Sequence, residues 1–315
     1  MNTKLTKLAA GIVLGFGIAG SAHAGALGIA DLTITAFGLI NVGTGQPITS
    51  GIAITSESRT GIAGSNYNGV DGTGVGPGSI SVFTPGASVD VKYRCAGPDC
   101  GSISGLYGGV LENNTTTHIS STPAGNYAMG DMFIAGSIIG ATGGQSLTRA
   151  DASANGPTNS GGSNATILNS AQALVQLIAL DNVNVALALS YDVFVKAFLD
   201  PLNPGEKGIA SGGTNFSVTV TSIDDPTFTL LNFTPTPLNQ GFTSTNPTEN
   251  QEFSQSGTAT SDTRTLHAGR RYNLTITQAS NATVQLIPEP TSIALLGLGL
   301  LGMGGLSASR KRAKA

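Results

Sequence analysis

The stretch VNVALALSYDVFVKAFL, residues 183–199, decides the fold class of this chain. Its odd-numbered positions are all apolar, whereas its even-numbered positions include Ser190, Asp192 and Lys196. A period of two residues is that of a β-strand with one packed face and one wet face. Because 17 residues exceed the usual strand length of about 3–10, we predict one long strand that is bent or bulged partway.

Phe194 and Phe198 lie on the otherwise polar face of this stretch. We therefore predict that a second sheet or a loop covers that face near its end. The segments NFSVTVTS and RYNLTITQ alternate in the same way. Further candidate strands are residues 31–42, 51–56, 80–83, 89–93 and 132–139.

The segment AQALVQLIAL, residues 171–180, fits either a helix or a strand. Asp181 and Asn182 would form a hairpin turn into the long strand, which favours the strand. Residues 61–78, 142–163 and 235–248 are rich in Gly, Ser, Asn, Thr and Pro and are predicted to be loops. The loop at 142–163 is long enough to connect two sub-lobes. Many strands separated by turn signals predict an all-β, antiparallel sandwich or jelly-roll-like domain over residues 25–286.

The N-terminal 24 residues have the three parts of a secretory signal peptide. Two lysines precede an apolar run at residues 8–20, and small residues at Ala22 and Ala24 fit a cleavage site. We predict that signal peptidase removes residues 1–24, so that the mature chain starts at Gly25. Export would use the Sec machinery, and an uncleaved N-terminal anchor is the alternative.

The C-terminal end combines an uncharged apolar run at residues 291–308 with a basic tail at 309–315. At about 1.5 Å per helical residue the run would be about 27 Å long, close to the hydrocarbon thickness of about 30 Å. Lysine and arginine are enriched on the cytoplasmic side of membrane helices. We therefore predict one transmembrane helix with a cytoplasmic tail, a buried core helix being the alternative.

The last 29 residues, 287–315, resemble the PEP-CTERM sorting signal of Gram-negative bacteria, because three unlike parts occur in the same order. The residues that carry the resemblance are Pro288, Glu289, Pro290, Arg310, Lys311 and Arg312. It implies recognition by an exosortase-type membrane enzyme, cleavage near Pro-Glu-Pro and release to the cell surface or matrix. The stretches YAMGDMFI, LALSYDVFVKAFLD and LHAGRRYNLTITQAS are also similar to the PEP-CTERM subset named for an EDSAxxY motif, although that motif itself is not present.

Residues 25–286 hold nine basic and seventeen acidic residues, a net charge of −8. An acidic surface argues against nucleic acid as a partner. Only two cysteines occur, Cys95 and Cys100 in CAGPDC. In an oxidising compartment they are predicted to form a disulfide that closes a turn. Free thiols are one alternative, and a metal site, which would need two more ligands, is the other.

Catalytic signatures are scarce. The sequence has no GxSxG, and His118 and His267 lie in polar or turn segments, so we predict no enzymatic activity. No cofactor is predicted; Ca²⁺ at the loop carboxylates Asp224-Asp225 and Asp181 is the alternative.

We therefore predict a non-enzymatic exported protein of the cell surface or matrix, first held in the inner membrane with its β domain periplasmic. An extracellular polysaccharide-binding module is the alternative, and an exported hydrolase ranks third.

Overall fold

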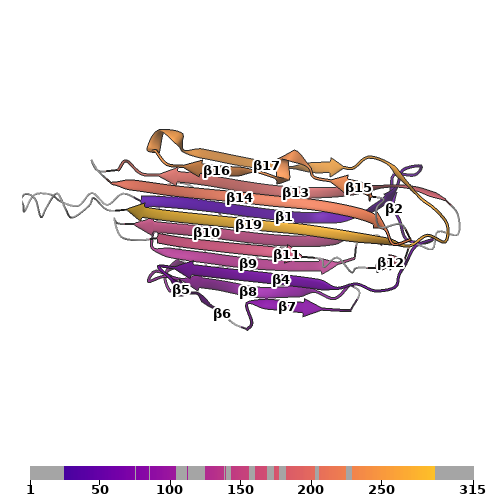
Figure 1. Cartoon of the computed structure of the whole chain (residues 1–315), viewed down its shortest axis with the longest axis horizontal. Coiled ribbons are helices and arrows are strands. Elements are labelled where there is room, and N and C mark those ends of the chain that lie inside the picture. Colours follow the sequence, from indigo (N-terminus) through magenta and orange to yellow (C-terminus); the bar gives the residue numbers. More distant parts are fainter. Residues whose placement is uncertain are drawn as a thin grey trace, which may run out of the picture.

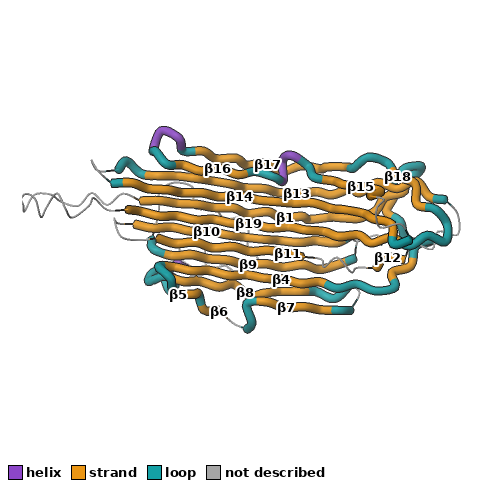
Figure 2. The backbone as a smooth tube through the Cα atoms, viewed as in Figure 1, coloured by secondary structure: helices purple, strands orange, loops and turns teal. Residues whose placement is uncertain are grey.

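The computed structural model describes residues 25–74, 76–84, 86–103, 112, 125–137, 139, 143–155, 160–168, 174–176, 182–202, 206–224 and 229–287. Within these ranges the chain forms two antiparallel β-sheets whose strands run along the long axis of the molecule (Figure 1). Strands account for most of the described chain (Figure 2). Side chains from both sheets share one apolar core. The predicted all-β, antiparallel fold is confirmed, and it takes the form of a sandwich.

Sheet A contains nine strands among the described residues. Its order is β17 (Gln251–Thr260), β13 (Val183–Leu199), β1 (Gly25–Asn41), β10 (Gly144–Asn155), β9 (Tyr127–Gly136), β8 (Val89–Ala96) and β6 (Thr73–Gly74). Two short strands join its flanks: β18 (Arg264–Leu266) pairs with β13, and β2 (Gln46–Pro47) pairs with β1.

Sheet B contains ten strands in the same described ranges. Its order is β15 (Thr229–Phe233), β14 (Lys207–Ser222), β19 (Tyr272–Ile287), β11 (Ser160–Leu168), β4 (Arg59–Tyr67) and β5 (Val70–Asp71). Four short strands pair alongside: β3 (Ala53–Ile54), β7 (Ser79–Val82), β12 (Leu174–Gln176) and β16 (Gly241–Ser244). Two 3₁₀ turns, Thr236–Leu238 and Pro247–Glu249, flank β16.

The apolar alternation in residues 183–199 matches the alternating faces of strand β13, which has the same bounds. Val193 and Val195 are fully buried and lie in the core that sheet A shares with Phe216 and Val218 of β14. Asp192, on the opposite face, is exposed. The predicted long strand and its buried face are therefore confirmed.

The predicted irregularity lies in the partner strand rather than in β13. The register pairs Ile34 with Tyr191 and Ala36 with Ser190, so that Thr35 is the extra residue of a bulge in β1. The sequence of β1 requires this bulge, because its core residues change from even positions such as Ile34 to odd positions such as Phe37. One extra residue keeps both sets on the buried face.

A second apolar cluster covers the outer face of sheet A. Phe194 packs there with Ile29, Met129, Tyr127 and Ile103. Ile103 belongs to the segment that follows β8, so a loop region covers this face. The prediction that Phe194 lies beneath a covering layer is confirmed.

The predicted loops at 61–78 and 142–163 are wrong for much of their length. Strand β4 continues to Tyr67, and β10 and β11 occupy most of the second range. These segments are composed of small and polar residues, which resemble loops in sequence. Strand β10 forms here because Ala150, Ala152 and Ala154 are fully buried against the other sheet. The third predicted loop, 235–248, contains β16, the first 3₁₀ turn and the start of the second, Pro247–Glu249.

Only residues 174–176 of the ambiguous segment 171–180 are described, and they form β12. Strand β12 pairs with β19 and β3 in sheet B, whereas β13 belongs to sheet A. The predicted hairpin between them is therefore wrong. Along β13 both edges are already taken by β1 on one side and by β17 and β18 on the other.

Candidate functional site at the end of the sandwich where β1 begins and β19 ends

Strand β1 begins and β19 ends at the same end of the sandwich, at the left in Figure 1. Strand register places them there: Ala26 pairs with Leu199 at the end of β13, and Ile287 pairs with Lys207 at the start of β14. Both strands are central, each with neighbours on two sides. We call this end of the sandwich the terminal end, and the opposite end the distal end.

Small side chains let the two sheets approach closely near the terminal end. A Cβ atom on Gly28 would lie 2.2 Å from the carbonyl oxygen of Ser211, and one on Gly212 would lie 2.2 Å from the carbonyl oxygen of Ile29. Only glycine permits such an approach of two backbones. The apolar cluster beside them consists mainly of alanines: Ala26, Ala150, Ala152, Ala154, Ala210 and Ala282.

The last two residues of β19 differ in their surroundings. Leu286 is buried in the alanine-rich cluster, with Leu199 and Leu202 packed nearby. Ile287 is 41% exposed, although its backbone still pairs with Lys207. The strand therefore remains part of the sheet up to the residue that precedes Pro288.

At the start of β1, Gly25 and Asp200 interact twice. The Asp200 amide donates to the Gly25 carbonyl oxygen at 2.8 Å, and the Gly25 amide donates to the Asp200 carboxylate. Burial raises the pKa of Asp200 above its ordinary value, and the hydrogen bond from Gly25 partly opposes that shift. Gly25 itself is buried, so its backbone nitrogen and the carboxylate lie in a partly desolvated environment.

A buried ionic group lies on the outer face of sheet A. Arg149 Nη2 lies 2.8 Å from Asp151 Oδ2, and its Nε lies 3.8 Å from Asp31 Oδ1. These three side chains are at most 2% exposed. Nearby, burial raises the pKa of Tyr93 to about 12, assisted by the charges of Asp151 and Asp131 and opposed by Arg149. The ion pairs match the rule that buried charges need partners.

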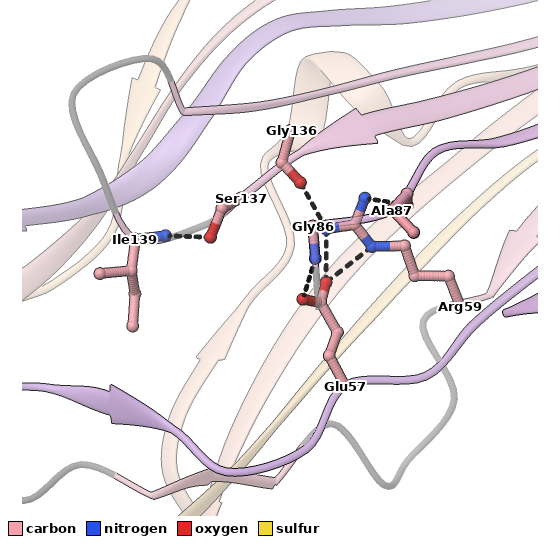
Figure 3. Close-up of polar contacts among 7 residues, drawn as sticks. All are labelled: Glu57, Arg59, Gly86, Ala87, Gly136, Ser137 and Ile139. Atoms are coloured by element: carbon pink, nitrogen blue, oxygen red, sulfur yellow. Dashed lines mark hydrogen bonds and ion pairs between the residues drawn. The ribbon is translucent and has the colours of Figure 1, made fainter. Parts of the chain in front are cut away.

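The distal end is held by another buried ion pair, between Glu57 and Arg59 (Figure 3). Arg59 Nε donates to Glu57 Oε1 at 2.6 Å, and Arg59 also donates to the carbonyl oxygens of Ala87 and Gly136. The second carboxylate oxygen accepts from the Gly86 amide at 3.0 Å. Because Gly136 belongs to β9 of sheet A and Arg59 to β4 of sheet B, this group ties the two sheets together. Its geometry is that of a structural clamp.

Cys95 and Cys100 are joined by a disulfide in the structure. The turn that it closes is tied to the terminal end through Asp99, whose carboxylate accepts from the Asn126 amide at 2.7 Å. Gly97 has a φ of 120°, and a Cβ there would lie 2.3 Å from the Asn126 carbonyl oxygen. The bridge therefore braces a backbone contact.

The other candidate residues are not brought together. Asp224 lies beside Arg271, with Oδ1 3.4 Å from Nη2. The backbone amide of His267 donates to the Tyr272 hydroxyl at 3.1 Å. This contact involves the backbone of His267 and not its imidazole ring. His118, Asp181 and Asp225 lie outside the described residues. Within the described ranges no three His, Cys, Asp or Glu side chains are grouped so that they could hold a metal ion.

Both predicted processing segments also lie outside the described residues. They include Ala22 and Ala24 at the leader cleavage site and, at the other end, Pro288, Glu289, Pro290, Arg310, Lys311 and Arg312. In the portion of the chain that is described, no helix is long and apolar enough to span a membrane.

Sequence reasoning missed Asp200 and the two close-approach glycines, since nothing local distinguishes them. It also missed the ionic group around Arg149. One signal was available for that group: the charges of Arg149 and Asp151 alternate with alanines along residues 149–154, with the period of a strand.

Residues 286–311 match the family model of the PEP-CTERM protein-sorting motif. No match was found among curated proteins or among solved structures. The finer resemblance to the EDSAxxY subset is not confirmed, because the family match covers the tail alone. The motif is an exosortase recognition signal and implies sorting of an exported protein. Leu286 and Ile287 belong both to β19 and to the matched range, so the chain carries a PEP-CTERM protein-sorting motif at residues 286–311 whose first two residues are the last two of β19.

Proposed function

We propose that this protein is a non-enzymatic exported protein whose β-sandwich is delivered to the cell surface or the extracellular matrix through its PEP-CTERM tail. The observation that carries the proposal is the overlap between β19 and the sorting motif at Leu286 and Ile287. Because the motif begins inside a paired strand, the processing enzyme would meet a folded sandwich directly beside its recognition sequence.

The overlap also limits where the tail can be cut. Leu286 is 5% exposed, and Ile287 is paired in the sheet with Lys207. A cut before either residue would need the end of β19 to leave the sheet. A cut before Leu286 would also remove its packed side chain. We therefore place the cut at or after Pro288, which leaves the sandwich intact in the released form.

The proposed precursor is held in the inner membrane, with a periplasmic sandwich and a cytoplasmic basic tail. Three residues separate Ile287 from the predicted membrane helix at 291–308. At most about 3.6 Å per residue, the terminal end would lie within about 14 Å of the helix start. The start of β1 lies at this same end, so the predicted leader and the predicted anchor would both meet the membrane there.

The decisive measurement is the intact mass of the protein recovered from the medium and from membranes. The extracellular form should begin at Gly25 and end between Pro288 and Pro290. The membrane form should begin at Gly25 and still end at Ala315. An extracellular form that retains the basic tail would contradict the proposal.

A Glu289→Ala variant tests the recognition element, which is assigned through the sorting motif. It should shift protein from the medium to the membrane fraction, with residues 291–315 still attached. Glu206→Ala serves as the control, because this glutamate lies at the same end of the sandwich but outside the motif. Equal release of both variants would speak against a sorting role for Glu289.

Polysaccharide binding on the same scaffold stays a second prediction. Sugar-binding surfaces use exposed aromatic rings, and in the described ranges the large aromatic side chain with high exposure is Phe83, at 78%. A pull-down with matrix polysaccharide, using the exported protein and its Phe83→Ser variant, tests this role. Binding that depends on Phe83 would favour it.

A further inference from the structure

The backbone nitrogen of Gly25 faces a carboxylate. The register that pairs Ala26 with Leu199 places Gly25 opposite Asp200. The Asp200 amide donates to the Gly25 carbonyl oxygen at 2.8 Å, and the Asp200 carboxylate accepts from the Gly25 amide. Pro201 follows directly, and a residue before proline is restricted to extended backbone. The carboxylate is therefore held in place by a paired and conformationally restricted chain.

The surroundings of this contact disfavour an isolated charge. Gly25 is buried, and the Asp200 side chain is partly buried. Burial is the larger cause of the raised Asp200 pKa, and the hydrogen bond from Gly25 is the smaller, opposing one. No charged side chain of the described residues is among the causes of that shift. A carboxylate in this setting is stabilised most by a cation at the position of its hydrogen-bond donor.

We propose that removal of the leader converts the Gly25–Asp200 hydrogen bond into an ion pair between the new α-ammonium group of Gly25 and the Asp200 carboxylate. This inference rests on the leader cleavage after Ala24 that is part of the proposed function. Hydrolysis of the Ala24–Gly25 peptide bond consumes one water, which supplies a hydroxyl to the Ala24 carbonyl carbon and a hydrogen to the Gly25 nitrogen. At neutral pH the products are a carboxylate and an ammonium group.

The ion pair would make the terminal end sensitive to processing. In the precursor the Gly25 nitrogen is a neutral amide, and the partly buried carboxylate accepts a hydrogen bond from it. In the mature chain an ammonium group left in the same place without a partner would be costly, and Asp200 supplies that partner. Asp200 thus positions the mature N-terminus at the side of the sandwich from which the sorting motif leaves.

The test measures the protonation of the N-terminal amine on the exported full-length protein recovered from membranes. Intact mass first identifies the terminal residue. Reductive methylation of the α-amine, followed by mass spectrometry from pH 6 to 10, then gives the amine pKa. An ordinary α-amine has a pKa of about 7.7–8.0. Pairing with Asp200 should raise it by about one unit, which slows methylation near pH 7 about tenfold.

Two variants sharpen the test. Asp200→Asn should return the amine to its ordinary pKa and methylation rate. Asp192→Asn is the matched control: it lies on the same strand, is exposed, and accepts a hydrogen bond from Ser256 at 3.0 Å, so it should leave the amine unchanged.

A second measurement covers the case in which Asp200→Asn folds poorly. Acetylation of the α-amine should lower the melting temperature of the wild-type protein and have little effect on the Asp200→Asn protein.

The outcomes separate the inference from the proposed function. If the leader is removed at Gly25 but wild type and Asp200→Asn share one amine pKa, the ion pair is refuted and the sorting proposal stands. If the chain begins at another residue, the ion pair is refuted, because Asp200 faces Gly25. If the leader is retained, both the inference and the proposed route of export fail.

Discussion

Gly28 and Gly212 allow the two sheets to pack closely at the terminal end. Each lies where a Cβ would meet a backbone carbonyl oxygen of the facing sheet at 2.2 Å. A contact of this kind cannot be relieved by rotating a side chain, because the obstructing atom belongs to the backbone of a paired strand. At the scale of single residues, the close spacing of the sheets at this end therefore requires that Gly28 and Gly212 have no side chain.

Gly28→Ala should destabilise the protein by about 3 kcal/mol or more, at or above the usual cost of overpacking. Gly241→Ala is the control, because a Cβ there would meet nothing within 4 Å, and it should change stability by less than about 0.5 kcal/mol. Urea unfolding of both proteins measures the difference. Equal stabilities would show that the sheets can separate at no cost.

The partly buried Tyr93 should make the stability of the protein depend on pH. Burial raises its pKa to about 12, whereas a tyrosine in an unfolded chain titrates near 10. The unfolded state therefore loses its proton first, and stability should fall as pH rises from about 10 to about 12. Tyr93→Phe should make that decline shallower. Urea unfolding at several pH values in this window measures the slope, and superimposable profiles would contradict the prediction.

At the scale of elements, β19 is the strand on which sorting and folding meet. It is paired with β14 along its whole length, from Tyr272 to Ile287. Its buried residues alternate with partly or fully exposed ones up to Leu286. The last buried and exposed pair of this strand, Leu286 and Ile287, limits how close to the sandwich the chain can be cut.

Leu286→Ala should cost about 2–4 kcal/mol, the usual range for removing a buried leucine side chain. Ile287→Ala is the neighbouring control and should cost less than about 1 kcal/mol, because its side chain is 41% exposed. Thermal or urea unfolding of the two variants distinguishes them. Similar losses would mean that the apolar core ends elsewhere than proposed.

The clamp between Glu57 and Arg59 has a comparable role at the distal end of β4. Arg59→Leu leaves Glu57 buried without its partner and should cost about 3–5 kcal/mol, whereas the Glu57→Gln/Arg59→Leu double variant should cost less. A double-mutant cycle by urea unfolding measures the coupling. If the single and double variants were equally stable, the pair would not hold the sheets together.

At the scale of the whole molecule, the proposed anchoring puts the sandwich upright on the membrane. Strand β19 has 16 residues, which at about 3.3 Å per residue span about 50 Å. Lys207 lies at the terminal end, and the exposed Phe83 lies next to Val82, which pairs with Arg59 at the distal end.

A fluorophore on a Lys207→Cys precursor should therefore be quenched by a lipid-headgroup quencher, and one on a Phe83→Cys precursor should not. Fluorescence of the membrane-bound precursor, reconstituted in vesicles, provides the measurement. Equal quenching at both positions would indicate a sandwich that lies flat on the bilayer, and the upright arrangement would then be wrong.

Sequence alone determined the features that depend on local pattern. The period of two in residues 183–199 predicted β13, Phe194 predicted a covered outer face, and the tripartite tail predicted the sorting motif. The change of apolar residues from even positions such as Ile34 to odd positions such as Phe37 already indicated the bulge of β1. The bulge was nevertheless expected in β13. Each of these signals lies within a few residues, where side-chain alternation and solvent preference act.

Tertiary structure decided which strands pair, and with it the terminal end. Backbone donors and acceptors are the same for almost every residue, so a strand carries no local mark of its partner. Gly25 meets Asp200 and the Gly28 site meets Ser211 only because chain segments far apart in sequence come together in the sandwich. Strand β10 was mistaken for a loop for the same reason, since its small residues favour a strand only where a second sheet lies close enough to bury them.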